Sequence, residues 1–195
     1  ENKWFQGMEV CNGETYYPTA HRWFLDKGLT MLGNSDIHDP DLNETSAPDK
    51  HRTLTLVFAR QRSIEGLKEA IFAGRTAVWY QGQLIGRQEW LKPLFDRCVV
   101  VEPPHLKAKN AVWIQVRNVC DLDIQLSRTG NVGPDEISLP ARTVTLLKIQ
   151  TQQPDALLEL SYTATNFVIE PEQGMPVTLR IGSCTSCQRW RPPGS

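Results

Sequence analysis

The pattern of apolar residues changes near residue 97, and this change limits the folds that the chain can adopt. Before this point, short apolar runs alternate with stretches whose apolar residues have helical spacing. After it, short strand-like runs follow one another, separated by clusters of turn residues. Alternating strands and helices are typical of α/β domains, and a series of short strands is typical of β-sandwiches. The sequence therefore predicts an α/β part over residues 1–97 and an all-β part after it.

The α/β part is expected to open with a strand–helix–strand unit of the parallel kind. Residues 8–12 and 29–33 are short apolar runs typical of buried strands. A helix is expected between them, because Pro18 suits a first helical turn and Gly28 suits a C-terminal cap. His21 is expected on the surface of that helix.

Further strands and helices complete the α/β part. Residues 39–51 are polar and lack periodicity, which predicts a long loop. Ser63 is a suitable N-cap for one helix, and Pro93 is expected to limit another to a couple of turns. These elements are expected, in chain order, at residues 53–59, 64–73, 76–80 and 87–95.

The all-β part is expected to form a small antiparallel sandwich over residues 98–183. Several of its runs alternate apolar and polar residues, which turns one face of each strand toward a core. Residues 184–195 lack a pattern and are expected to form a flexible tail. The strands are expected at residues 98–102, 111–118, 124–127, 143–149, 156–162 and 177–181.

Charge and composition exclude several classes of partner. The 195 residues carry a formal net charge of -1, with basic and acidic residues interspersed. This mixture argues against a nucleic-acid-binding stripe or a polybasic membrane patch. No apolar run approaches the ~20 residues that span a bilayer. The chain begins at Glu1 rather than Met, so we expect its natural N-terminus upstream; its compartment, bacterial cytoplasm or periplasm, and its oligomeric state stay open.

The five cysteines do not describe a disulfide framework, because their number is odd and their spacing irregular. Cys184 and Cys187 form a CxxC motif without a second pair. Since a structural zinc site needs four ligands, we expect this pair to be inert.

The segment around Asp36 and His38 carries the clearest chemical signal. An apolar run ends at Gly33, and the two side chains then follow two residues apart in a polar loop. On an extended segment they would point to the same side and could converge on one ion. Carboxylate and imidazole together suit Zn, Mn or Fe. The alternative is that Asp36 caps a turn and His38 is an incidental surface residue.

Several blocks occur in an order that resembles the end of a PHP (polymerase and histidinol phosphatase) domain. The resemblance is carried by a strand, a Gly-x-Ser-Asp-x-His block, a second strand, a helix and an Ala-Gly-Arg-Thr block. Within that family the chain is similar to the Sb-PDE-like phosphodiesterase branch, whose members also have a C-terminal β domain. The blocks are Gly7–Val10 with Asn12-Gly13, Gly33–His38, Thr55–Ala59 and Ser63–Thr76, together with Tyr16–Pro18, Leu84–Gly86 and Leu91–Phe95.

The resemblance implies a distorted (β/α)7 barrel that hydrolyses a small phosphoester with metal-activated water. It implies that Asp36 and His38 are catalytic metal ligands in a cluster of two or three divalent ions, Zn, Mn or Fe. The family's N-terminal His-x-His pair, further histidines and a glutamate are not found in these residues. We therefore expect the C-terminal part of a metal-dependent phosphoesterase, inactive alone and weak in metal binding.

Other residues and functions remain as alternatives. Arg52 follows the long loop and would bind substrate phosphate or form a structural salt bridge. Asn12 and Glu9 end a strand and would line the pocket or pair within the turn. The function would otherwise be that of an amidohydrolase-like metalloenzyme, or of a non-catalytic binding protein with a degenerate barrel and a ligand-binding sandwich.

Overall fold

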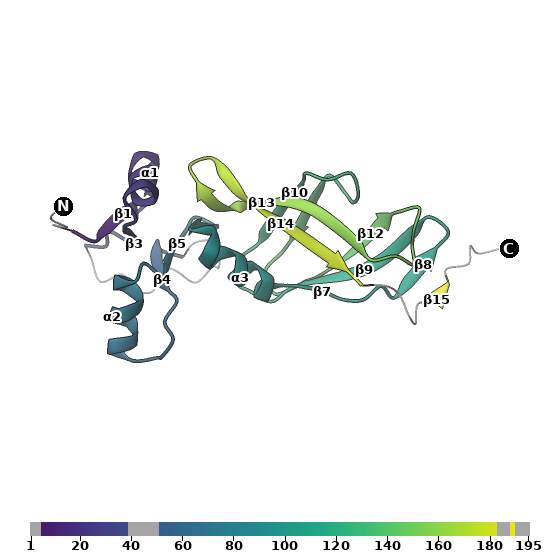
Figure 1. The fold of residues 1–195 in the computed structure, drawn as a ribbon, viewed down its shortest axis with the longest axis horizontal. Helices are drawn as coiled ribbons and strands as arrows, with labels where there is room; N and C mark the ends of the chain where they lie inside the picture. The colour runs from purple at the N-terminus through teal and green to yellow at the C-terminus, as the bar shows by residue number, and fades with distance from the viewer. Residues whose placement is uncertain (1–4, 39–50, 183–187, 190–195) are drawn as a thin grey trace. The chain divides into compact units, whose positions relative to one another are not determined.

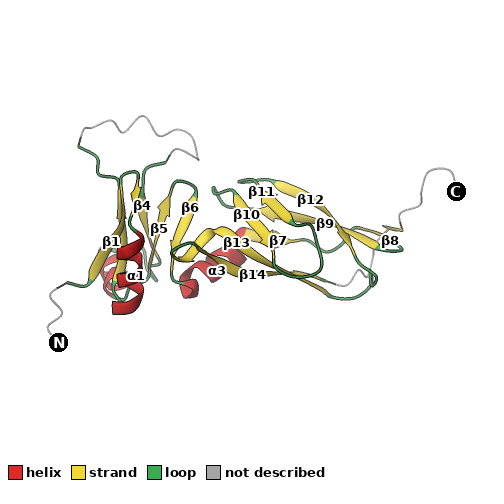
Figure 2. Ribbon diagram, turned by 90° about the horizontal axis from the view of Figure 1, so that it is seen from above, coloured by secondary structure: helices red, strands yellow, loops and turns green. Residues whose placement is uncertain are grey.

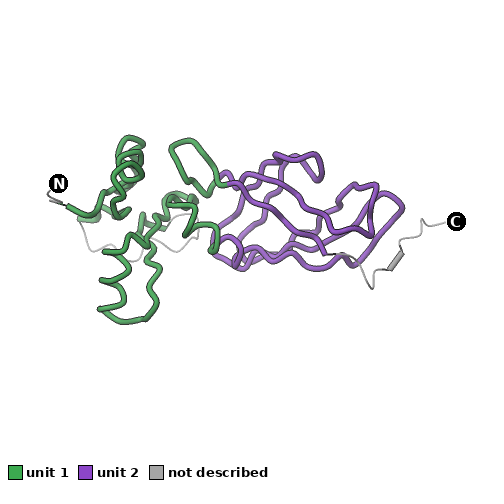
Figure 3. The backbone as a smooth tube through the Cα atoms, viewed as in Figure 1, with its two compact units in different colours: residues 1–94, 166–175 green, residues 95–165, 176–195 purple. Residues whose placement is uncertain are grey.

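The computed structural model describes residues 5–38, 51–182 and 188–189 (Figure 1). The chain divides into two compact units: residues 1–94 with 166–175, and residues 95–165 with 176–195 (Figure 3). The first segment of unit 1 ends close to the boundary expected at residue 97. Unit 1 also contains residues 166–175, which lie within the range expected to be all-β. In the described part of the chain, no helix is long and apolar enough to cross a membrane.

Unit 1 opens with the expected parallel strand–helix–strand unit. Strands β1 (Gly7–Asn12) and β3 (Thr30–Asn34) pair in parallel, and β2 (Thr15–Tyr16) extends the sheet on the other side of β1. Helix α1 (Pro18–Lys27) connects them; it begins at its proline, and Gly28 caps it in the left-handed conformation with its N–H donated to the Phe24 carbonyl. Pro18 and Gly28 therefore correctly predicted the two ends of the helix.

The next strands of unit 1 run antiparallel, which differs from an uninterrupted parallel barrel. Strand β4 (Leu54–Val57) pairs with β5 (Thr76–Tyr80) in antiparallel register. Helix α2 (Ile64–Phe72) lies between them and begins after Ser63, whose hydroxyl accepts from the Gly66 N–H. The Phe58 N–H donates to the Arg75 carbonyl at 2.9 Å. The chain thus leaves β4 and enters β5 at the same end, and α2 is an insertion into the loop of a hairpin.

Strand β6 (Gln83–Gly86) was not expected from the sequence, yet it pairs antiparallel with β5 (Figure 2). The two-residue connection explains it: Gln81 has φ 44° and Gly82 has φ 73°. Two successive left-handed residues form the tight turn whose twist suits a β-hairpin. The C-terminal end of β13 (Leu158–Glu170) then pairs with β6 in parallel.

Helix α3 (Gln88–Cys98) is longer than expected. Pro93 was predicted to limit it to a couple of turns, but the helix continues for five residues beyond that proline, to Cys98. The prediction was wrong because a proline removes a single hydrogen bond, to the carbonyl four residues earlier. Leu91 and Phe95 are both buried, and their packing supports the helix across the missing bond.

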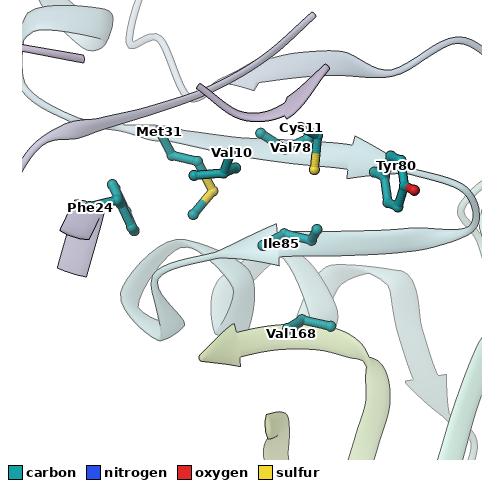
Figure 4. Close-up of a cluster of buried hydrophobic side chains, with 8 residues drawn as sticks. All are labelled: Val10, Cys11, Phe24, Met31, Val78, Tyr80, Ile85 and Val168. Atoms are coloured by element: carbon teal, nitrogen blue, oxygen red, sulfur yellow. The ribbon is translucent and has the colours of Figure 1, made fainter. Parts of the chain in front are cut away.

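The core of unit 1 is a cluster contributed by α1 and several strands (Figure 4). Each member is at most 8% exposed. Burial of such side chains stabilises a fold by about 1.5–3 kcal/mol for each large residue. The cluster consists of Val10, Cys11, Phe24, Met31, Val78, Tyr80, Ile85 and Val168.

His21 belongs to the buried side of α1, so its expected place on the helix surface was wrong. The residue has no solvent exposure, and its Nδ1 lies 2.7 Å from the Tyr16 hydroxyl. Burial lowers the pKa of His21 to about 4, against a smaller opposing effect of the Ile169 backbone. Tyr16 in β2 supplies a hydroxyl partner for the neutral imidazole. His21 can therefore be buried, although the spacing of apolar residues predicted a solvent-exposed position.

Unit 2 contains two groups of paired strands, which agrees with the expected sandwich (Figure 2). In one, β9 (Ala111–Asn118) pairs antiparallel with β7 (Val99–Val101), β8 (Leu106–Ala108) and β12 (Val144–Gln150). In the other, β10 (Ile124–Arg128) pairs with β11 (Glu136–Leu139) and β13, which pairs with β14 (Gln173–Ile181). Alternate residues along these strands are buried. Most of the expected tail lies outside the described residues, but β15 (Gln188–Arg189) pairs with β8.

Gly33 in β3 is expected to tolerate no side chain. An added Cβ would lie 2.4 Å from Val78 Cγ1 and 3.2 Å from Thr53 Cγ2. We expect Gly33→Ala to lower the free energy of unfolding by about 1–3 kcal/mol through overpacking. Urea denaturation followed by tryptophan fluorescence measures the loss. Gly182→Ala is the control, because a Cβ there meets nothing within 4 Å; equal stability of the two variants would contradict the prediction.

Stability should fall as the pH drops through the range in which only the unfolded chain protonates His21. The ordinary value of 6.5 holds in the unfolded chain, and the folded value is about 4. The native state therefore excludes the proton, and stability present above pH 6.5 is lost toward pH 4, by up to about 3 kcal/mol. Urea midpoints of the native chain and His21→Gln, compared between pH 7 and pH 4, measure this loss. Parallel pH curves for both proteins would contradict it.

Candidate metal-binding edge

Gly13 joins three chain segments at the carboxyl end of the β1–β3 pair. Its φ is 56°, in the left-handed region. Its N–H donates to the Asn34 carbonyl at 2.9 Å, and its carbonyl accepts from Thr53 Oγ1 at 2.6 Å. A Cβ on Gly13 would lie 3.5 Å from Asp36 Cβ. The end of β1, the end of β3 and the residues entering β4 therefore meet beside Asp36.

Asp36 is exposed and has φ 54°, so the segment that carries it is not extended as expected. Aspartate is among the few residues that adopt the left-handed conformation readily. The turn brings His38 Nδ1 to 2.9 Å from the Asp36 carbonyl oxygen. Because a carbonyl only accepts, Nδ1 donates this hydrogen bond, and in the neutral ring Nε2 carries the lone pair. The two residues are coupled through the backbone of Asp36, not by a shared orientation along a strand.

Glu9 and two asparagines form a second group on the same edge. Asn34 Nδ2 donates to Glu9 Oε1 at 2.6 Å, and Asn12 Nδ2 lies 3.4 Å from Glu9 Oε2. The Asn12 side chain, expected to bind substrate or form the turn, thus touches Glu9. Its Oδ1 is buried and has no hydrogen-bond partner in the described part of the chain. A buried acceptor without a donor is a candidate for a cation or water.

His51 is the residue that sequence analysis did not assign to the edge. Its Nδ1 lies 2.7 Å from the Arg52 carbonyl, and its ring packs on Trp79 with the centroids 3.9 Å apart. Its Nε2 is buried and unpartnered among the described residues. Two residues later, Thr53 bonds to Gly13. Its position at the end of a polar loop that enters a strand was the available signal, but the sequence assigned it only to that loop.

These donors are suited to a metal ion but do not by themselves complete a site. In residues 5–38 and 51–182, no group of three His, Cys, Asp or Glu side chains is placed to hold one ion. Imidazoles whose Nδ1 is bonded to a carbonyl are oriented for metal binding through Nε2. Both His38 and His51 have that arrangement. The chemistry of the donor set therefore fits a divalent ion that takes further ligands from elsewhere.

Arg52, expected near substrate phosphate, is half-buried immediately before Thr53 at this edge. Its backbone carbonyl accepts from His51. Arg75, by contrast, lies in the loop between α2 and β5, where its Nε donates to the Phe58 carbonyl at 3.1 Å and its guanidinium is ion-paired with Glu69. Arg75 therefore holds the two ends of the β4–β5 connection together.

Both units of the chain include residues that are similar to known proteins. Residues 99–180 match the family model of an Ig-like domain. The matched range includes most of unit 2 and fits its β-sandwich. Over 90% of its length, the chain is similar to a crystal structure of a two-domain protein containing a predicted PHP-like metal-dependent phosphoesterase from Bacteroides vulgatus ATCC 8482, with a TM-score of 0.82 and 35% sequence identity.

The matched proteins are longer than this chain. The chain spans 52% of the Bacteroides structure. It is also 30% identical over 93 residues to the DNA relaxase MbeA of Escherichia coli, a match that covers 46% of this chain and 17% of the relaxase. The printed activity belongs to the Bacteroides protein, and for this chain both the phosphoesterase activity and the Sb-PDE-like branch remain predictions.

The chain alone should bind divalent zinc in the micromolar range or more weakly, because its described donors do not complete a site. Isothermal titration calorimetry measures the affinity. Cys184→Ser and Cys187→Ser are included in every sample, since thiolates would otherwise bind zinc. Nanomolar binding that is lost in Asp36→Asn or His38→Gln would contradict the expectation and indicate a complete site.

Proposed function

We propose that unit 1 supplies one edge of the active site of a metal-dependent phosphoesterase, acting on phosphomonoesters or phosphodiesters. The observation that carries the proposal is the orientation of two imidazoles, His38 and His51, whose Nδ1 atoms are bonded to backbone carbonyls. This arrangement leaves Nε2 of each ring as an electron-pair donor. The similarity to a predicted phosphoesterase over 90% of the chain supports the same reaction class.

Asp36 and His38 are proposed as metal ligands, and Asn12 Oδ1 and His51 Nε2 as additional donors. A divalent ion, Zn, Mn or Fe, would supply a bound water of lowered pKa and neutralise charge on the phosphoryl group. The chain's own residues position these groups. The Gly13 N–H donates to the carbonyl of Asn34, two residues before Asp36, and Thr53, two residues after His51, donates to the Gly13 carbonyl.

Arg52 is proposed to orient substrate. Its guanidinium would offer two parallel donors to phosphate oxygens, which suits a planar bidentate contact. Its half-buried position immediately before Thr53 supports a role at the same edge as His51. An ion pair within unit 1 is the alternative role of this side chain.

A second candidate function is ligand binding by unit 2. A surface pocket of about 410 Å³ lies beside Trp113, and Lys148 Nζ is 5.4 Å from the centre of the Trp113 ring. A tryptophan edged by amides and ammonium groups could recognise a polar ligand such as a glycan. The pocket is lined by Ala108, Lys109, Asn110, Ala111, Trp113, Lys148 and Gln150.

DNA processing is not part of the proposal. The relaxase similarity covers 17% of that protein. The formal net charge of this chain is -1, with both signs interspersed, whereas nucleic-acid binding depends on neutralising phosphates with clustered lysine and arginine.

Hydrolysis by the natural gene product that contains residues 1–195 tests the phosphoesterase proposal. We expect metal-dependent release of nitrophenol from nitrophenyl phosphate or its bis-ester, with at least roughly a 100-fold lower kcat/KM in Asp36→Asn and His38→Gln. The matched controls are Asp26→Asn and His105→Gln, which change an exposed aspartate on α1 and an exposed histidine in unit 2. Equal activity of the site and control variants would contradict the proposal.

A further inference from the structure

Two free cysteines of unit 2, Cys98 and Cys120, lie next to one another although they are far apart in the sequence. Cys98 ends α3 and is 6% exposed, whereas Cys120 follows β9 and is half-buried. The antiparallel pairing of β7 and β9 aligns Val99 with Asn118. One residue further out, the Val119 N–H donates to the Cys98 carbonyl at 2.9 Å. The backbone at the two cysteines therefore keeps the spacing of paired strands.

The turn after β9 directs the Cys120 side chain. Asn118 is buried, and its Nδ2 donates to the Leu122 and Leu139 carbonyls at 2.7 and 2.8 Å. Its Oδ1 accepts from the Cys120 N–H at 3.1 Å and lies 3.0 Å from Cys120 Sγ. The Cys120 carbonyl accepts from the Arg142 N–H at 3.1 Å. The position of this thiol is thus fixed by hydrogen bonds from both sides of the turn.

The side chains of Cys98 and Cys120 also interact with one another. This interaction lowers the pKa of Cys120 and raises the pKa of Cys98; burial raises the pKa of Cys98 further. A pair in which one thiol ionises more readily provides a nucleophile and a second sulfur that can resolve the adduct. The other described cysteine, Cys11, lies in the core of unit 1, where burial raises its pKa to about 12.

We propose that Cys98 and Cys120 are a redox-active dithiol that forms a disulfide within the Ig-like unit. The oxidant is a small disulfide such as oxidised glutathione. The Cys120 thiolate attacks one sulfur of the oxidant and releases one glutathione thiolate. The Cys98 thiolate then attacks Cys120 Sγ and releases the second. Two protein thiols become one disulfide, and the oxidant is reduced to two molecules of glutathione.

The bond would connect the residue before β7 with the turn after β9, so it would close a loop that includes β7, β8 and β9. Closing a loop of this kind restricts the unfolded chain and stabilises the folded unit. This inference is independent of the proposed phosphoesterase activity, because both cysteines belong to unit 2 and the proposed metal ligands belong to unit 1.

Thiol counting on the 195-residue chain with Cys184→Ser and Cys187→Ser tests the proposal, because these changes remove the cysteines outside the described residues. After incubation with oxidised glutathione, alkylation in denaturant should find one free thiol, that of Cys11. Trypsin should yield residues 98–107 linked to residues 118–128, two hydrogen masses below the sum of the reduced peptides. The thermal midpoint should rise by at least about 5 °C over that of the reduced chain.

Single variants and a denatured control separate the outcomes. Cys98→Ser should leave Cys120 as a stable glutathione adduct, and Cys120→Ser should leave Cys98 reduced. Three free thiols in the native chain would overturn the proposal, as would glutathione adducts on both cysteines without a crosslink. A crosslink that forms only in denaturant would also overturn the proposal. The thiol count on the chain that retains Cys98, Cys120 and Cys11 does not depend on whether the single variants fold.

Discussion

The hydrogen bonds of Gly13 bring together the residues of the proposed metal-binding edge of unit 1. Through its N–H and carbonyl this residue connects the end of β3 with the residues entering β4. Its left-handed backbone conformation, with φ 56°, suits a glycine at this junction beside Asp36. Without this junction the Asp36–His38 turn and His51 would belong to separate loops. The core beneath, in which Met31 and Val78 pack together, supplies the rigid support that a metal-binding edge requires (Figure 4).

Local signals predicted the elements whose ends are set by single residues. Pro18 and Gly28 fixed the limits of α1, and Ser63 marked the start of α2, because caps act within one turn of the chain. The sandwich was equally predictable, since its strands alternate buried and exposed residues. Features that depend on distant partners were missed. His21 is buried because Tyr16 supplies a hydroxyl, and no periodicity reports such a partner.

The candidate site was predictable in composition and less so in geometry. Asp36 and His38 stood out as residue types, yet the left-handed turn at Asp36 could not be read from their spacing. His51 was not predicted as part of the site because the hydrogen bond that brings its segment to this edge joins Thr53 and Gly13, which are 40 residues apart in the chain. The antiparallel β4–β5 pair was also unexpected, since a helix between two strands usually signals a parallel crossover. The Phe58–Arg75 hydrogen bond instead joins the end of β4 to the start of β5, so the two strands run antiparallel.

Nitrogen-15 NMR of the histidine side chains tests the central claim, that His38 binds metal through Nε2 while Nδ1 stays bonded to the Asp36 carbonyl. The measurement uses the natural gene product containing these residues, titrated with zinc. We expect the Nε2 resonance of His38 to move on zinc addition while Nδ1 remains protonated, with the same response at His51 and none at the exposed His105. Zinc-induced loss of the His38 Nδ1 proton, or no response at His38, would contradict it.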